Sequence, residues 1–168
     1  MEVLRTQGVG GVRVLGLAQS LDVTRGSFYW HFRDRQDLLD HMLDWWDRKM
    51  TDTVISHTDR FKGDGHKRIL ALAEVVLRQD RNRYEMAMRS WAEGDRKAAA
   101  VFRRVIQKRL EYVSGLFGDA GFSPGEATAR GHLLAIYLMG ENALHIGTSL
   151  ENRLRLLRRQ VRTLTKRG

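Results

Sequence analysis

Residues Asp22–Leu38, DVTRGSFYWHFRDRQDL, decide the fold of the N-terminal part of this 168-residue chain. An apolar segment with helical periodicity ends just before the stretch, at Leu21, and another long one follows it. Thr24 and Asp34 are of the residue types that cap helices, so the stretch predicts a tight turn, a brief helix and the start of a longer helix. Helix, tight turn and short second helix together are typical of a helix-turn-helix that reads DNA.

The same stretch resembles the DNA-binding segment of the tetracycline-repressor (TetR) family. That family carries the pattern A-x-x-x-G-V-S/T-x-G-x-x-Y-x-H-F-x-x-K-x-x-L, and nine positions of this chain fall on it: Ala18, Val23, Thr24, Gly26, Tyr29, His31, Phe32, Arg35 and Leu38. Asp22 stands where the family has a glycine, and aspartate accepts a left-handed conformation better than most residues. The resemblance implies a one-component transcription regulator in which the rest of the chain is a sensor and dimer module.

The start of the predicted recognition helix carries small and polar side chains, which suit entry into the major groove. Arg25 can pair with guanine O6 and N7, Gly26 lets the backbone approach, and Ser27 can donate to a base or a phosphate. Tyr29 and His31 offer donors to phosphates, which position a helix without reading sequence. The predicted DNA-binding residues are Arg13, Thr24, Arg25, Gly26, Ser27, Tyr29, Trp30, His31 and Arg35.

The flanking members of this set have more specific expectations. Trp30 would press on a thymine methyl group or a sugar edge, and Arg13, which replaces the family's usual threonine-type cap, would touch a phosphate. Arg35 begins the next helix, where its charge and the helix-end amides favour a phosphate. Phe28 and Phe32 are predicted to be core residues that fix the angle of the recognition helix.

Composition limits the remaining classes of function. The chain has no cysteine, so disulfides and thiolate metal sites are excluded. No segment approaches the roughly 18 apolar residues of a membrane span, and the N-terminus lacks the apolar centre of a signal peptide. No zinc-protease, phosphate-loop or nucleophile-elbow motif occurs. We therefore expect a cytoplasmic protein that is not an enzyme, with no cofactor, no metal and no membrane partner.

The net charge of +9 lies mostly outside the predicted DNA-binding segment. Residues 1–35 hold five Lys/Arg against three Asp/Glu, whereas residues 151–168 hold seven against one. The DNA-binding segment is therefore nearly neutral, and its contacts depend on placement. The basic C-terminal segment is interpreted as a solvated helix face and tail.

Helical periods dominate the whole chain, and nothing alternates with period two. We predict an all-α fold of about nine helices, with a three-helix helix-turn-helix DNA-binding domain over residues 1–45. A helical effector-binding and dimerisation domain follows over residues 46–168. Only seven residues precede Gly8, whereas the family has a longer first helix, so we expect either a true start upstream of Met1 or a weakly braced DNA-binding domain.

The family places a dimer interface on its last two large helices. The segment 124–147 is apolar nearly all round, which predicts burial on two sides. Apolar residues of segment 150–164 step by four and three, a seam suited to another helix. The predicted interface residues are Leu133, Ile136, Gly140, Leu144, Leu154, Leu157 and Val161. The alternative is that these residues form the core of a monomeric bundle.

The family also holds a ligand cavity between its fourth and eighth helices. Methionine and aromatic side chains suit an adaptable apolar cavity, although each of them is also common in ordinary cores. The candidate lining residues are Trp45, Met86, Trp91, Phe102, Tyr112 and Tyr137.

Three functions compete. The leading hypothesis is a ligand-responsive repressor that binds a palindromic double-stranded DNA operator as a homodimer and is released by an unknown small apolar effector. The second is a DNA-binding regulator without such an effector, controlled by a protein partner or by abundance. The third is a small helical enzyme or carrier, against which the motif at 22–38 and the missing catalytic set both argue.

Overall fold

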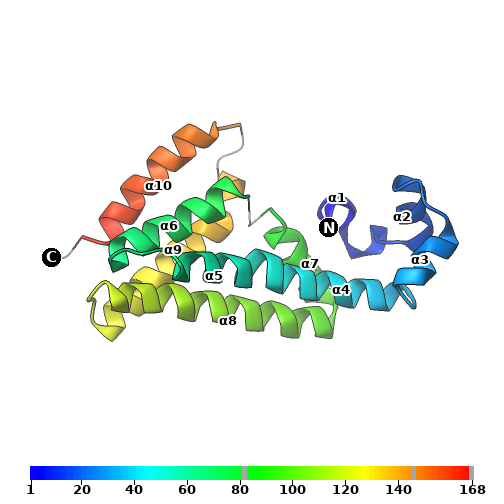
Figure 1. Ribbon diagram of the computed structural model, residues 1–168, viewed down its shortest axis with the longest axis horizontal. Coiled ribbons are helices and arrows are strands. Elements are labelled where there is room, and N and C mark those ends of the chain that lie inside the picture. The colour runs from blue at the N-terminus through cyan, green and yellow to red at the C-terminus, as the bar shows by residue number, and fades with distance from the viewer. Residues whose placement is uncertain (81–82, 145–146, 167–168) are drawn as a thin grey trace. The chain divides into compact units, whose positions relative to one another are not determined.

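The computed structural model describes residues 1–80, 83–144 and 147–166. These residues form helices and turns and contain no strand, which confirms the predicted all-α class (Figure 1). The elements are α1 (Glu2–Gly11), α2 (Val14–Ser20), α3 (Arg25–His31), α4 (Arg35–Asp47), the π-helical segment η1 (Arg48–Asp52), α5 (Thr53–Asp59), α6 (Gly65–Arg78), α7 (Glu85–Gly94), α8 (Arg96–Asp119), α9 (Pro124–Leu144) and α10 (Leu150–Leu164). Because α4, η1 and α5 follow one another without a gap, the described helices form nine continuous runs, the predicted number.

Side-chain caps fix where several helices begin. Thr24, Asp34 and Asp64 each accept a hydrogen bond from the backbone N–H three residues on, as their positions in the sequence predict. For α10, the capping-box spacing of Thr148 and Glu151 predicts a cap at Thr148, but Ser149 is the residue that accepts from the N–H of Asn152. Both residues are capping types, and the local backbone selects the second.

The short first helix α1 bends at Gly8. This residue has φ +67°, which L side chains rarely adopt, and the chain turns there before α2. Leu4 on one side of the bend and Val12 on the other are both buried. The bend therefore lets a short segment bury two apolar side chains.

The chain divides into two compact units. The first contains residues 1–48 and 84–102, so α7 and the start of α8 join α1–α4. Its core includes Leu43, Trp46 and Met88, and α1 packs on α7. The predicted boundary at residue 45 lies close to the end of this unit's first segment, but residues 84–102 had been assigned to the second domain.

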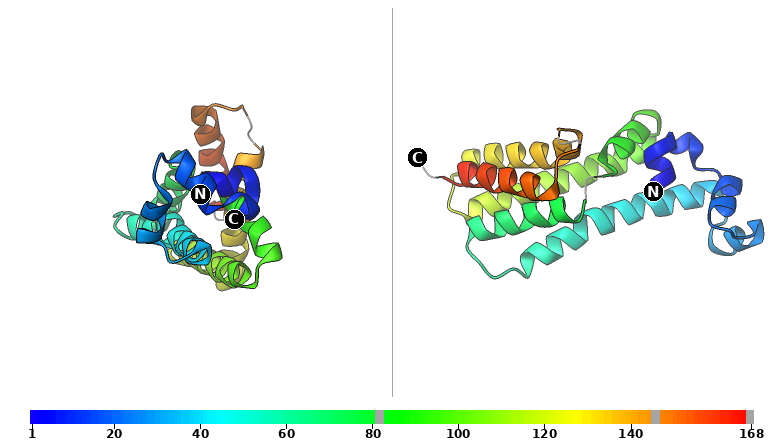
Figure 2. Two further views of the ribbon diagram at one scale, coloured as in Figure 1. Left: turned by 90° about the vertical axis from the view of Figure 1, so that its right-hand side faces the viewer. Right: turned by 90° about the horizontal axis from the view of Figure 1, so that it is seen from above.

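The second unit contains residues 49–83 and 103–168 and holds a single apolar cluster. Helix α6 packs against α5, α9 and α10, and Figure 2 shows α6, α9 and α10 side by side. At Gly131 of α9 a Cβ would lie 2.7 Å from the Cα of Ser114, so a glycine is needed where α9 crosses α8. None of the described helices has the length and apolar character to cross a bilayer.

Candidate DNA-binding interface

The turn between α2 and α3 is closed by backbone hydrogen bonds. The N–H of Val23 donates to the carbonyl of Ala18 at 3.0 Å, and Ala18 is itself buried. Asp22 has φ +52°, the left-handed conformation that the sequence predicts for the position where the family has glycine. The turn therefore keeps its geometry without the glycine.

Thr24 fixes the start of the recognition helix α3. Its hydroxyl accepts from the N–H of Ser27 at 3.1 Å and lies 3.0 Å from the Ser27 hydroxyl. Thr24 and Ser27 are thus held against each other at the exposed end of α3, which limits the rotamers of both.

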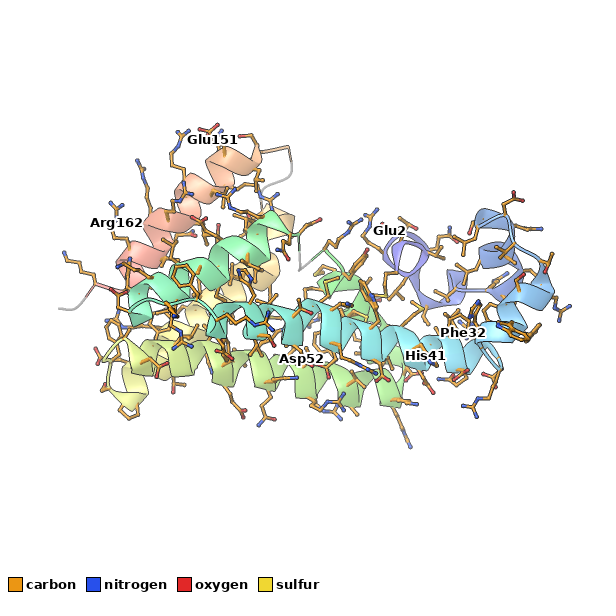
Figure 3. The ribbon with its side chains drawn as sticks, viewed as in Figure 1. Glu2, Phe32, His41, Asp52, Glu151 and Arg162 are labelled. Atoms are coloured by element: carbon orange, nitrogen blue, oxygen red, sulfur yellow. The ribbon has the colours of Figure 1, made fainter. Side chains whose placement is uncertain are left out.

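A small aromatic cluster sets the orientation of α3. Phe28 is buried, as predicted, and its ring lies 5.2 Å from that of Phe32 and 5.3 Å from that of Tyr29. Phe32 is half-buried and packs on His41 of α4 with ring centroids 5.4 Å apart; both are labelled in Figure 3. Because Phe28 is the one buried residue of this seven-residue helix, the remaining side chains of α3 stay on the surface.

The predicted contact residues on α3 share one property, which is exposure. Trp30 is 86% exposed, although a side chain of its size is usually buried. Arg25 lies over the ring of Tyr29, with its Cζ 5.5 Å from the ring centroid, so the two side chains order each other. The exposed predicted residues are Arg13, Thr24, Arg25, Gly26, Ser27, Tyr29, Trp30, His31 and Arg35.

Gly26 is not required by the packing of the chain. A Cβ at this position would meet only the Thr24 hydroxyl, at 3.6 Å, which is an ordinary contact. Glycine costs a helix about 1 kcal/mol relative to alanine. The residue therefore gives up helix stability without an internal reason for doing so.

Arg35 has a role that the sequence did not indicate. Its Nε donates to the carbonyl of Val12 and its Nη2 to that of Val9, both at 2.6 Å. The guanidinium thereby holds the end of α1 against the start of α4. Arg13 makes a similar local contact, since its Nε donates to the carbonyl of Gly10 at 3.1 Å. A phosphate contact by Arg35 would compete with these carbonyls.

The charges around the start of α4 are partly neutralised within the chain. Asp37 accepts from the backbone N–H of Arg33 at 3.0 Å and also meets the Arg33 guanidinium. The backbone hydrogen bond is the main cause that holds the pKa of Asp37 below its usual range. The Asp37 carboxylate therefore stays ionised near the surface that carries α3.

The six predicted pocket residues are divided between the two units. Trp45, Met86, Trp91 and Phe102 belong to the first and Tyr112 and Tyr137 to the second. Trp91 is buried and Phe102 stacks on Trp46 at 5.7 Å, but Met86 is 69% exposed, because it lies on the outer side of α7. As a pocket residue Met86 is therefore a poor candidate.

Tyr112 borders a groove of about 440 Å³ in the second unit. Its hydroxyl donates to Asp59 at 2.6 Å, and Arg68 contacts both Asp59 and Asp119. The lining residues are Ile55, Arg68, Lys108, Glu111, Tyr112, Gly115, Leu116 and Asp119. Four of these eight residues are charged, so the groove differs from the aromatic and methionine-lined cavity expected from the sequence.

The predicted dimer residues differ in exposure between the two helices. Leu133, Ile136 and Leu144 of α9 are exposed, Ile136 to 65%, and Gly140 between them is half-buried. The seam on α10 is a correction, because it packs inside the chain's own core and is not available to a partner. The residues concerned are Leu154, Leu157 and Val161.

Two polar contacts were not found from the sequence. Tyr84 donates to Glu2 at 2.6 Å, joining the start of α7 to α1. In the second unit Glu141 is fully buried and accepts from both Nε and Nη2 of Arg153. An acid within the long apolar run of α9 was a signal for the second contact, whereas the first joins residues 82 positions apart and left no local signal.

Comparison with known proteins adds to this geometry. Residues 1–42 match the family model described as bacterial regulatory proteins, tetR family. Over 77 residues the chain is 26% identical to the HTH-type transcriptional regulator AcrR of Shigella flexneri. This match covers 46% of the chain and 34% of AcrR, so it spans about a third of that relative.

Solved structures resemble nearly the whole chain. A Clostridium perfringens protein assigned to the regulation of fatty acid metabolism has a TM-score of 0.77 at 10% identity, covering 95% of this chain and 92% of its own. The fatty acid degradation regulator FadR of Bacillus halodurans has 0.71 at 14%, covering 98% and 89%. A TetR-family transcriptional regulator of Rhodococcus sp. has 0.66 at 17%, covering 98% and 93%. At these identities the likeness is one of fold alone.

Proposed function

Since this chain belongs to the tetR family of bacterial regulatory proteins and is a DNA-binding transcription regulator, we propose that it is a repressor that reads a palindromic operator through α3. The observation that carries the proposal is the state of α3. A capped N-terminus and one buried phenylalanine hold this helix, and every other side chain on it is exposed. A surface helix that buries so little is suited to burial against a partner.

Different side chains of this surface take different roles. Arg25 is the proposed base reader, because its guanidinium matches guanine O6 and N7. Thr24, Ser27, Tyr29 and His31 supply hydroxyl and ring donors to phosphates, and Trp30 supplies apolar contact to a base or sugar edge. Gly26 admits the DNA backbone. Arg13 and Arg35 remain proposed phosphate contacts, Arg35 in competition with its carbonyl partners.

A homodimer would give the two readers that a palindrome requires. The support is the exposed apolar face of α9, formed by Leu133, Ile136 and Leu144, with Gly140 permitting a close helix crossing. Exposed apolar patches of this kind mark interaction sites in soluble proteins. The two recognition helices would then lie about 34–36 Å apart, one turn of DNA.

We also propose release by a small apolar effector and action in the cytoplasm, where the operator lies. Support for the effector is the aromatic interior of the first unit, where Trp91 is buried and Trp46 stacks on Phe102. A compound that loosens this interior would have the differential affinity that allostery requires. Compounds that raise the melting temperature and also release bound operator would identify the effector class.

Selection of bound sequences from a random duplex library tests the main proposal. The wild-type chain is expected to enrich a two-fold symmetric site. Arg25→Ala should relax the preference at one position of each half-site by about 1–3 kcal/mol. Tyr29→Phe should weaken binding to all DNA sequences about equally, since phosphate contacts do not read bases. Absence of any enriched sequence with the wild-type chain would refute the operator proposal.

A further inference from the structure

The outer face of α10 carries the exposed cations Arg155, Arg159 and Arg162, and the exposed Lys166 follows two residues after the helix ends at Leu164; the four residues together are called the α10 stripe. We propose that this α10 stripe is a second DNA-binding surface, which contacts the phosphate backbone of double-stranded DNA without reading its sequence. The proposal concerns a surface separate from the recognition helix, and it goes beyond operator reading.

The spacing of the three arginines places them on one side of the helix. Steps of four and three residues keep Arg155, Arg159 and Arg162 within a sector of roughly 60°. At 1.5 Å per residue, successive charges lie about 4.5–6 Å apart along the axis. All three side chains and that of Lys166 are exposed, and Arg162 is labelled on α10 in Figure 3. The arginine charges therefore form a line along α10.

Three of the four stripe cations differ from the other arginines of α10, because they have no acidic partner among the described residues. Arg153 is paired with Glu141, and Arg158 with Glu74 at 2.7 Å. Arg159, Arg162 and Lys166 make no ion pair with any residue in the described ranges 1–80, 83–144 and 147–166. Arg155 has one exposed contact, 3.8 Å from Glu151. The cations of α10 nearest the core are thus paired with acidic residues, whereas most of the outer ones are not.

The chemistry of the face favours nucleic acid over a membrane. A helix that binds in a bilayer interface inserts its apolar side. On α10 that side is already used, since Leu154, Leu157 and Val161 are buried in the chain's own core. The stripe therefore has charge to offer and no apolar surface with which to insert.

The same argument disfavours a protein partner. Protein interfaces depend on buried aromatic or aliphatic anchors, and the stripe contains none; Leu156 is exposed only beside it. A line of cations without anchors matches a regular polyanion, whose affinity comes from counterion release. Such a surface would keep the regulator on DNA between encounters with its operator.

The experiment removes operator reading and then tests the stripe. In the full chain with Arg25→Glu and Ser27→Glu on α3, binding to a fluorescein-labelled 40-base-pair duplex of random sequence is measured by anisotropy from 50 to 200 mM KCl. Adding Arg159→Gln, Arg162→Gln and Lys166→Gln should lower the affinity at 50 mM KCl at least tenfold. The slope of log K against log salt should fall by about 2.7, or 0.9 per lost contact.

A matched control removes the same charge elsewhere. Arg60→Gln, Lys62→Gln and Arg103→Gln neutralise three exposed cations outside the stripe and should leave the slope within about 1 of its starting value. Equal losses in both triple variants, or no loss in the stripe variant, would overturn the proposal. Stripe-dependent binding to phosphatidylglycerol vesicles or polyglutamate that is tighter than binding to the duplex would overturn it too. Operator binding by the stripe variant with wild-type α3, measured in parallel, reports on the proposed function separately.

Discussion

Arg35 donates through its Nε to the carbonyl of Val12 at 2.6 Å, and this contact fastens the end of α1 to the start of α4. The same guanidinium reaches the carbonyl of Val9 through Nη2. Two donors in a fixed plane thus bind two carbonyls at the end of a short helix, and the Val9 carbonyl also accepts from the N–H of Val12. This side chain therefore braces the short helix α1 against α4.

Replacing Arg35 with Gln should lower the free energy of unfolding by about 2 kcal/mol, since hydrogen bonds from charged donors each contribute about 1.5–3 kcal/mol and these are partly exposed. Arg35→Lys should recover little of this lost stability, because one ammonium group cannot reproduce the planar, forked donors of the guanidinium. Urea denaturation measures both. If Arg35→Gln unfolds like the wild type but loses operator binding, Arg35 serves the phosphate and not α1.

Gly26→Ala tests whether the glycine serves the stability of the fold or the binding of DNA. The added Cβ has room within the chain, so the variant should be as stable as the wild type or up to about 1 kcal/mol more stable. Operator affinity should fall about tenfold, the equivalent of 1.4 kcal/mol, because the methyl group keeps the DNA backbone away. Gly115→Ala on α8, whose Cβ would meet nothing within 4 Å, is the control and should keep full affinity. Equal affinity in both variants would remove Gly26 from the interface.

Ile136→Glu tests the α9 interface. Since Ile136 is 65% exposed in one chain, the substitution should leave the fold intact and, if the face pairs with a second copy, should yield monomers at micromolar concentration. Light scattering after size exclusion gives the mass. Met86→Glu, also on an exposed apolar residue but on α7, should stay dimeric. A wild-type monomer under the same conditions would refute the dimer.

The sequence predicted features that depend on local chemistry. The caps at Thr24, Asp34 and Asp64, the left-handed Asp22 and the buried Phe28 all follow from residues within a few positions. The sequence could not indicate which side of an apolar helix faces the core of its own chain. The leucine seam of α10 was therefore assigned to a partner, although α10 packs on α6 and α9 of its own chain.

Long-range polar contacts likewise could not be predicted from the sequence. Arg35 looked like a phosphate ligand because its position near a helix start suits one, and only the fold shows the carbonyls of α1 beside it. Glu141 and Arg153 each had many possible partners. Such pairs are set by how helices cross, which hydrophobic periodicity does not encode.

Breaking the buried pair of Glu141 and Arg153 should lower the free energy of unfolding strongly, whereas replacing both residues with apolar ones should lower it much less. Glu141→Gln leaves the guanidinium with a neutral partner in the interior of the second unit and should cost about 3–5 kcal/mol of unfolding free energy. The double variant Glu141→Leu/Arg153→Met should recover most of the loss, because no buried charge remains. Chemical denaturation of the single and double variants gives the coupling between them. Additive losses would mean that the two residues do not act as a pair.

Tyr112 should make the second unit sensitive to strongly alkaline solution. Burial, together with the hydrogen bond to Asp59 and its charge, raises the pKa of Tyr112 to about 12. An unfolded tyrosine ionises near pH 10, so the folded chain holds this proton more tightly. The resulting stability is present in full below pH 10 and is lost as the pH rises from 10 toward 12.

Tyr112→Phe should therefore show a shallower fall of unfolding free energy between pH 10 and 12 than the wild type. The difference in absorbance at 295 nm between the two proteins gives the ionisation of Tyr112 alone. Asp59→Asn, which removes the charge but keeps an acceptor, should bring the pKa of Tyr112 back toward its ordinary value. If the wild-type signal from Tyr112 already titrates near pH 10, the contact with Asp59 does not form in solution.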